Sequence, residues 1–166
     1  MKVKIKILNY LLICFILAGF IGLAACDKNN PLTPILGACS GSNLCFKMNG
    51  TQYTMNANWT TPPSRNRIPW EEGSGANYKN IELDIYGNST GAYNVDTSSS
   101  ASNRATFQYF INDGGSVTNI QGLSGTVNLT EITTTTISGN FTITAKDQTG
   151  VDYTITEGNF VSVPKP

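Results

Sequence analysis

Four side chains between positions 60 and 79 could together bind a partner molecule: Arg65, Arg67, Trp70 and Tyr78. Guanidinium groups offer N–H donors in a planar fork, and aromatic rings stack on flat surfaces, so this set can hold a sugar or a peptide. A second interpretation is that Trp70, directed by Pro69, closes one end of a β-sandwich as a packed plug. We favour the plug for Trp70, and the sequence leaves ligand contact open.

Glu82 and Asp84 are the carboxylates whose spacing could support hydrolysis. Two positions apart on one strand, they would share a face with about 6.5–7 Å between their Cα atoms. Glycosidases place two carboxyl groups roughly 5–10 Å apart. The preferred interpretation is a solvated outer face, because Ile81, Leu83 and Ile85 alternate with the two acids and predict a core-facing side.

Other catalytic chemistries lack their residues in this sequence. The chain contains no histidine, which removes Ser-His-Asp and Cys-His catalysis and imidazole metal sites. No glycine-rich phosphate loop follows a strand and opens a helix, so nucleotide binding has no support. We therefore expect no enzymatic activity, no metal and no cofactor.

Cys39 and Cys45 enclose a short stretch of small and polar residues. In an exported protein the compartment is oxidising, and this spacing lets the two thiols meet. We favour a disulfide, which would constrain a small loop and contribute about 2 kcal/mol. The alternative is two unpaired cysteines, one of them packed on the first strand. A metal site is less favoured, because no further soft ligands are evident.

The N-terminus has the organisation of an export signal. Lys2, Lys4 and Lys6 precede an apolar run over residues 10–25, and this run is shorter than the roughly 20 residues that a stable membrane span needs. A positively charged start followed by such a run predicts a cleaved signal peptide. An uncleaved single-span anchor is the alternative.

The end of the apolar run, Leu23-Ala24-Ala25-Cys26, resembles the lipobox of bacterial lipoproteins. The resemblance implies cleavage before Cys26, a diacylglyceryl group on its thiol and acylation of the new amine. Several acyl chains hold a protein firmly to a membrane, since each buried CH₂ contributes about 0.8 kcal/mol. We therefore expect residues 1–25 to be removed and Cys26 to carry the anchor.

The mature chain divides into a tether and one domain. Residues 26–42 contain two prolines and several small polar residues and predict a lipidated cysteine with a flexible tether. Residues 43–166 predict a single domain. Loss of the three signal-peptide lysines leaves eight basic against eleven acidic side chains, so nothing attracts nucleic acid electrostatically.

Period-2 alternation of apolar and polar residues dominates the domain, over residues 46–48, 53–59, 81–85, 93–95, 107–111, 127–129, 137–145 and 151–155. Asn49-Gly50 accepts positive φ at both turn positions and predicts a hairpin in which Met48 faces Thr51 and Phe46 faces Tyr53. Glu157-Gly158 predicts a bulge in the last strand. The pattern indicates an all-β fold of about eight or nine antiparallel strands, a sandwich or a flattened barrel.

Residues 60–79 interrupt this alternation. Pro62, Pro63, Pro69, Gly73 and Gly75 predict an irregular segment, because proline removes a donor from a β-ladder. It would be the longest loop of the domain and therefore the most favourable place for function.

Both ends of the domain resemble a known family. Residues 125–130, 137–145 and 153–160 are similar to the closing "SGTFxFTA … G … VTNGxF" hairpin of small β-rich lipoproteins from Bacteroidetes. Residues 46–53 are similar to their "AxINGxxWxA" opening, with Tyr53 where tryptophan is usual. These motifs build hairpins and no active site, and the family has no assigned biochemical activity. The resemblance therefore implies the fold and the location in the cell envelope, and it leaves the function open.

Two functional hypotheses follow from the sequence. The first is a lipoprotein of the cell envelope, anchored in the outer membrane through Cys26, whose domain binds a glycan, a peptide or another envelope protein without catalysis. The alternative is a barrel that encloses a small apolar ligand in a cavity of some hundreds of Å³. A glycosidase built on Glu82 and Asp84 is a distant third.

Overall fold

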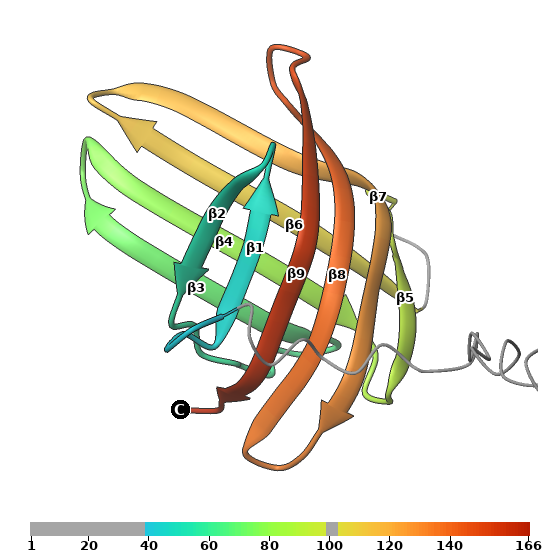
Figure 1. Cartoon of the computed structure of the whole chain (residues 1–166). Helices are drawn as coiled ribbons and strands as arrows, with labels where there is room; N and C mark the ends of the chain where they lie inside the picture. The colour runs from blue at the N-terminus through green and yellow to red at the C-terminus, as the bar shows by residue number, and fades with distance from the viewer. Residues whose placement is uncertain (1–38, 99–102) are drawn as a thin grey trace, which may run out of the picture. The chain divides into compact units, whose positions relative to one another are not determined.

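The structure is a computed structural model that describes residues 39–98 and 103–166 (Figure 1). The chain divides into two units, Met1–Thr33 and Pro34–Pro166, and all the described residues belong to the second. The signal peptide, the lipobox residues Leu23, Ala24 and Ala25, and the lipid-attachment residue Cys26 lie outside the described residues. So does most of the predicted tether.

Within the described residues the secondary structure consists of nine strands: β1 (Leu44–Met48), β2 (Thr51–Met55), β3 (Asn66–Ser74), β4 (Asn77–Tyr86), β5 (Gly91–Val95), β6 (Arg104–Asp113), β7 (Ser116–Ile132), β8 (Thr136–Asp147) and β9 (Asp152–Pro164). The predicted all-β fold is confirmed. This part of the chain holds no helix long and apolar enough to cross a membrane.

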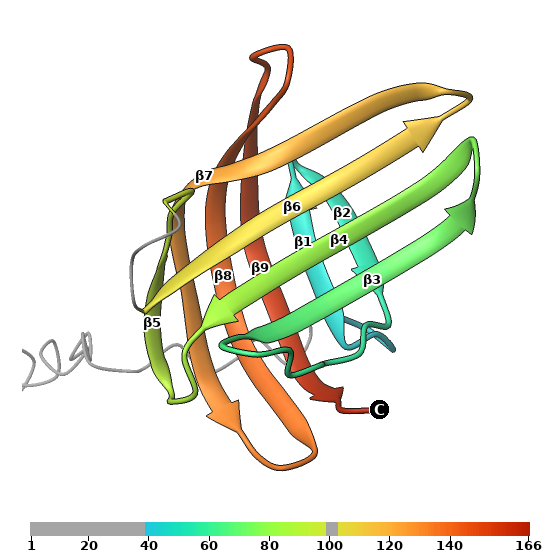
Figure 2. The same cartoon turned by 180° about the vertical axis from the view of Figure 1, so that it is seen from behind.

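The nine strands form one sheet in the order β2-β1-β9-β8-β7-β5-β6-β4-β3. The sheet folds over itself, so that β2, β1, β9 and β8 lie across β3, β4 and β6 and make a nearly closed, flattened barrel (Figures 1 and 2). β2 and β3 are its two edge strands. Of the two predicted architectures, the flattened barrel is the better description.

β7 connects the two layers. Residues 116–121 pair with β6, residues 126–129 pair with β5, and most of the strand pairs with β8. Register shifts at 122–124 and 129–131 bend it between these partners, as extra residues in one strand of a pair do. The pairings are antiparallel apart from a two-residue parallel contact of β5 with β6, which the sequence did not predict.

The first hairpin has the predicted register. Met48 pairs with Thr51 and Phe46 with Tyr53, and both Asn49 and Gly50 have positive φ. The predicted bulge in β9 is also present, because the pairing of β9 shifts register near Glu157 against β1 and β8 alike.

Aromatic rings from both layers fill the interior. The Phe46 ring on β1 lies 6.2 Å from that of Phe107 on β6, and the Phe141 ring on β8 lies 6.1 Å and 6.5 Å from these two. All three side chains are buried. Tyr109 joins them, and burial raises the pKa of its hydroxyl to about 12. Side chains thus occupy the centre of the barrel.

The prediction of an irregular segment over residues 60–79 was wrong for most of its length. β3 begins at Asn66 and contains Pro69, which pairs with Glu82. The backbone N–H and C=O of Arg67 bond to Thr60, away from β4. Pro69, two residues on, has the same orientation. The N–H that it lacks would point off the sheet edge, so the β3–β4 ladder loses no donor.

Candidate functional site

The structure separates the four side chains that the sequence grouped between residues 60 and 79. Arg67 and Tyr78 point to the outer face of the β3–β4 pair, and Arg65 reaches that face from the turn before β3. Trp70 is half-buried and packs against the core. The four therefore do not form one binding surface. The packing of Trp70 agrees in part with the favoured interpretation of this residue as a plug.

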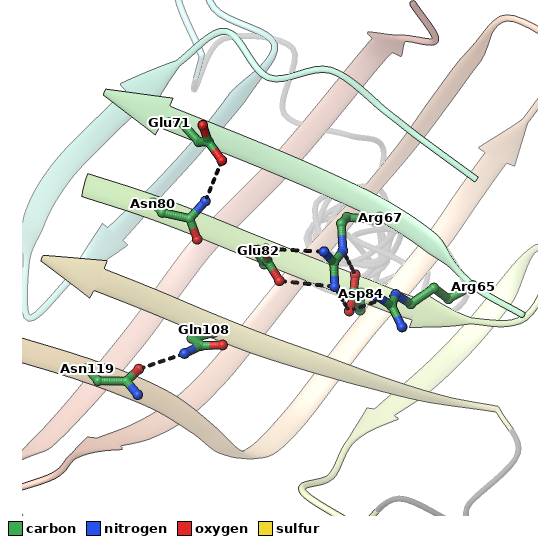
Figure 3. A network of polar contacts seen from close by, with 8 residues as sticks. All are labelled: Arg65, Arg67, Glu71, Asn80, Glu82, Asp84, Gln108 and Asn119. Carbon is green, nitrogen blue, oxygen red and sulfur yellow. Dashed lines mark hydrogen bonds and ion pairs between the residues drawn. The ribbon is translucent and has the colours of Figure 1, made fainter. Parts of the chain in front are cut away.

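Arg65, Arg67, Glu82 and Asp84 form an outer cluster on β3 and β4 (Figure 3). Arg67 donates from Nε to Asp84 Oδ1 at 2.8 Å and from Nη2 to Asp84 Oδ2 at 3.0 Å. Its Nη1 donates to Glu82 Oε1 at 3.2 Å. Arg65 Nε lies 3.1 Å from Asp84 Oδ2 without the alignment of a hydrogen bond. One guanidinium thus holds both carboxylates.

The outer cluster is arranged as a structural clamp. Asp84 is only 5% exposed, and its hydrogen bond raises the pKa of Arg67 against the opposing effect of burial. The direction predicted for Glu82 and Asp84, outward and opposite Ile81, Leu83 and Ile85, is confirmed. Solvation was predicted wrongly for Asp84, because the sequence does not reveal the arginines that cover it.

The polar face continues beyond the clamp. Glu71 accepts a hydrogen bond from Asn80 at 3.3 Å, and Gln108 on β6 donates to Asn119 on β7 at 3.0 Å (Figure 3). Burial, and next the charge of Glu71, raises the pKa of Tyr78. Most of these polar groups bond to a neighbour across the strands and stabilise the sheet.

A pocket of about 280 Å³ is lined by all four residues of the outer cluster and extends to Thr97 and Gln121. Tyr86 forms part of its wall, and the guanidinium of Arg104 stacks on the Tyr86 ring at 3.7 Å. The ring thereby has one face covered by a cation. Glu82 and Asp84 in the same wall are bonded to Arg67. Most of the polar groups that line the pocket therefore already have partners.

A second hollow lies at the seam between the chain leaving β2 and the edge strand β3. It has a volume of about 330 Å³ and is lined by Asn56, Asn58, Pro69, Trp70 and Glu71. We call these five residues the seam cleft. Asn56, Asn58 and Trp70 form no side-chain hydrogen bond within residues 39–98 and 103–166, and both asparagines are exposed. The seam cleft therefore offers polar groups without partners.

The sequence missed the two asparagines of the seam cleft. They alternate with Ala57 and Trp59 on the strand-like continuation of β2, where a polar outward position is the ordinary expectation. Their proximity to Trp70 comes from the bridge between Thr60 and Arg67, which brings this continuation beside β3. This pairing could be predicted from the sequence only if residues 66–74 were first recognised as a strand.

Cys39 and Cys45 are joined by a disulfide with 5.4 Å between their Cα atoms. Cys45 is fully buried on β1. No group of three or more metal-ligating side chains occurs in the part of the chain that the structure describes. The bridge links the segment before the sheet to the first strand.

Comparison with known proteins gives one result. No curated protein and no solved structure matches the chain. A family model, "Domain of unknown function (DUF6252)", matches residues 72–164, which run from the end of β3 to the end of β9. The match includes the C-terminal segments that resembled a lipoprotein family and excludes the opening hairpin and all five residues of the seam cleft. Because it covers more than half of the sequence, the chain belongs to the DUF6252 family, a family of unknown function.

Proposed function

We propose that this chain is a lipoprotein of the bacterial cell envelope whose β-domain binds a partner without catalysis. The proposed location is supported by the sequence Leu23-Ala24-Ala25-Cys26, which follows a basic N-terminus and an apolar run. Lipid on Cys26 would hold the domain at the outer membrane. The binding role is supported by the seam cleft.

The observation that carries the binding proposal is the contrast between engaged and unengaged polar groups. In the outer cluster, Glu82 and Asp84 are held by arginines. In the seam cleft, Asn56 and Asn58 stand beside Trp70 with their amides unbonded to the described residues. Binding sites combine an apolar surface with a few polar groups that are free to meet a ligand. The seam cleft places two such amides beside Pro69 and Trp70.

The alternatives have less support. A barrel that encloses an apolar ligand needs empty space at its centre, and the rings of Phe46, Phe107 and Phe141 occupy it here. A glycosidase needs one carboxyl group that can give up a proton and another that acts as base or nucleophile. Glu82 and Asp84 instead both accept hydrogen bonds from the guanidinium of Arg67, so each carboxylate already has a partner in the sheet.

The anchor is tested by metabolic labelling with a palmitate analogue. The wild-type chain should take up label and run as a processed protein, whereas Cys26→Ala should remain an unlabelled precursor. Cys14→Ala, a change within the apolar run, is the matched control and should label normally. Equal labelling of the Cys26→Ala chain would refute the lipid assignment.

The binding role is tested by photo-crosslinking in intact cells. A benzophenone amino acid replaces Asn58 in the seam cleft or, as a control, the exposed Asp152 at the start of β9. Illumination should give a product of higher mass from position 58 and none from position 152. If neither position gives a product, or both do so equally, the seam cleft is not the binding surface.

A further inference from the structure

We infer that the ligand of the seam cleft is a neutral saccharide chain. This inference rests on the proposed binding role and adds to it the chemical class of the partner. It follows from four features of the cleft: a fixed aromatic surface, free amides, the local charge and the form of the sheet edge.

Trp70 supplies the apolar surface. The side chain is half-buried and packs against the core, so its indole ring is fixed before any ligand arrives. Trp70 is also one of the five residues that line the cleft. An indole has a flat apolar face and one N–H donor at its edge. A sugar ring presents a matching combination, with C–H groups on one face and hydroxyls around its rim.

Asn56 and Asn58 supply the hydrogen bonds. They lie two residues apart in an extended segment and so point to the same side, with about 6.5–7 Å between their Cα atoms. Each amide can donate two hydrogen bonds and accept two, and a hydroxyl can both donate and accept. Two amides at this spacing can therefore bond to hydroxyls at separate points along a saccharide, and neither must first break a bond to the described residues.

The local charge favours a neutral ligand. Glu71 is the one charged side chain among the five that line the seam cleft. The nearest arginine on the same strand, Arg67, is committed to Glu82 and Asp84 on the outer face. An acidic polysaccharide would meet a carboxylate without a cation to balance it, which is unfavourable. Glu71 can instead accept hydrogen bonds from neutral hydroxyls.

The sheet edge disfavours an extended peptide, the main competing ligand. A peptide that adds a strand to β3 needs the outward N–H groups of that strand. Arg67 has already used its own in bonding to Thr60. The next outward position is Pro69, which has no N–H. Proline at this place blocks strand addition, so the cleft favours a ligand that bonds to side chains.

The test uses the full lipidated protein in detergent micelles and titrates it with defined probes. The neutral probes are cello-, xylo-, malto- and manno-hexaose. The acidic probes are polygalacturonate and heparin fragments, and the last probe is an extended hexapeptide of alternating valine and threonine. Binding is measured by calorimetry and by the tryptophan fluorescence. At least one neutral hexasaccharide should bind, and neither the acidic probes nor the peptide should.

Two variants locate the binding. The double change Asn56→Ala, Asn58→Ala alters exposed side chains and should weaken binding of that saccharide about tenfold or more, since each lost hydrogen bond costs several-fold. Asn94→Ala, which removes an equally exposed amide on β5, is the matched control and should bind as wild type. Trp70→Phe keeps an aromatic ring in the packing and should lower affinity without unfolding the protein.

The outcomes separate this inference from the proposed function. Binding of the peptide or the acidic probes alone would overturn the neutral saccharide, and so would saccharide binding that survives the double change. If no probe binds but position 58 still crosslinks in cells, the saccharide inference fails and the binding role stands. If crosslinking fails as well, both fall.

Discussion

Among single residues, Asp84 has the most unusual environment. Its side chain is 7% exposed and lies beside the guanidinium groups of two arginines, Arg65 and Arg67. An ionised carboxylate in such a place is stabilised by charge-assisted hydrogen bonds and would be costly without them. Asp84 therefore ties the turn before β3 and the strand itself to β4, and it keeps the edge of the sheet in place.

We predict that Asp84→Asn lowers the free energy of unfolding by about 2 kcal/mol, because hydrogen bonds to charged groups contribute roughly 1.5–3 kcal/mol. The change keeps the side-chain volume and removes the charge. Asp152→Asn is the matched control, since Asp152 is 82% exposed and pairs with Lys146 on the surface, where pairs contribute little. Urea unfolding followed by circular dichroism measures both. Equal midpoints for the two variants would show that the clamp is not stabilising.

Tyr109 predicts a dependence of stability on alkaline pH. Burial raises the pKa of its hydroxyl to about 12, above the unfolded value of about 10. The contribution of this group is therefore complete below pH 10 and is lost as pH rises toward 12, because the unfolded chain ionises first. Tyr109→Phe removes the titrating group. Between pH 10 and 12, the free energy of unfolding should fall less steeply for Tyr109→Phe than for the wild type, and equal slopes would contradict the assignment.

Among the elements, β3 shows what the sequence could not predict. Proline within an alternating stretch normally argues against a strand, and Pro69 led to the prediction of a loop. The strand is possible because β3 is an edge strand and because the orientation of Arg67 places the missing N–H off the ladder. Both facts depend on pairings between distant segments. The seam cleft was missed for the same reason, since its walls are brought together by the bridge of Thr60 with Arg67 and by the hydrogen bond from Trp59 to Asn66.

Local features were predicted well where the residue types themselves favour a turn or a bulge. Asn49-Gly50 determines the β1–β2 register through positive φ at adjacent positions. Glu157 and Gly158 likewise mark the shift in the pairing of β9. β7 was only partly predicted, because residues 116–125 lack a continuous apolar alternation and pair with partners on both sides. Local signals thus determine turns, while long-range pairing determines the length of the strands.

Packing of β8 on β9 gives a prediction at this scale. Gly158 pairs with Phe141, and a methyl group at position 158 would lie 2.5–2.6 Å from atoms of the Phe141 ring. Gly158→Ala should therefore destabilise the protein by about 1–3 kcal/mol, as over-filled cores do. In the background of Phe141→Leu, which removes the ring, the same change should cost clearly less. A double-mutant cycle of urea unfolding measures the difference, and an additive result would mean that the ring is not the cause.

For the whole molecule, the loop through which the chain enters the sheet supports one wall of the seam cleft. The disulfide of Cys39 and Cys45 closes the loop directly before β1. Within this loop, Asn43 donates from Nδ2 to the carbonyl of Ala57 at 2.9 Å and accepts from the N–H of Ala57 at 2.7 Å. Ala57 lies between the two asparagines of the seam cleft. The position of the cleft wall therefore depends on the loop that the disulfide holds.

Reduction of the disulfide should affect stability and the seam cleft together. We expect the free energy of unfolding to fall by about 2 kcal/mol, since the bridge closes a short loop. Amide exchange at Ala57 should accelerate more than exchange at Phe107 in β6, because the bonds from Asn43 lose their support while the β4–β6 ladder keeps its own. Asn43→Ala in the oxidised protein is the control that tests whether the effect reaches Ala57 through the bonds with Asn43. It should accelerate exchange at Ala57 while the disulfide stays intact. If reduction changes exchange equally at Ala57 and Phe107, the loop does not position the cleft, and the disulfide acts only on global stability.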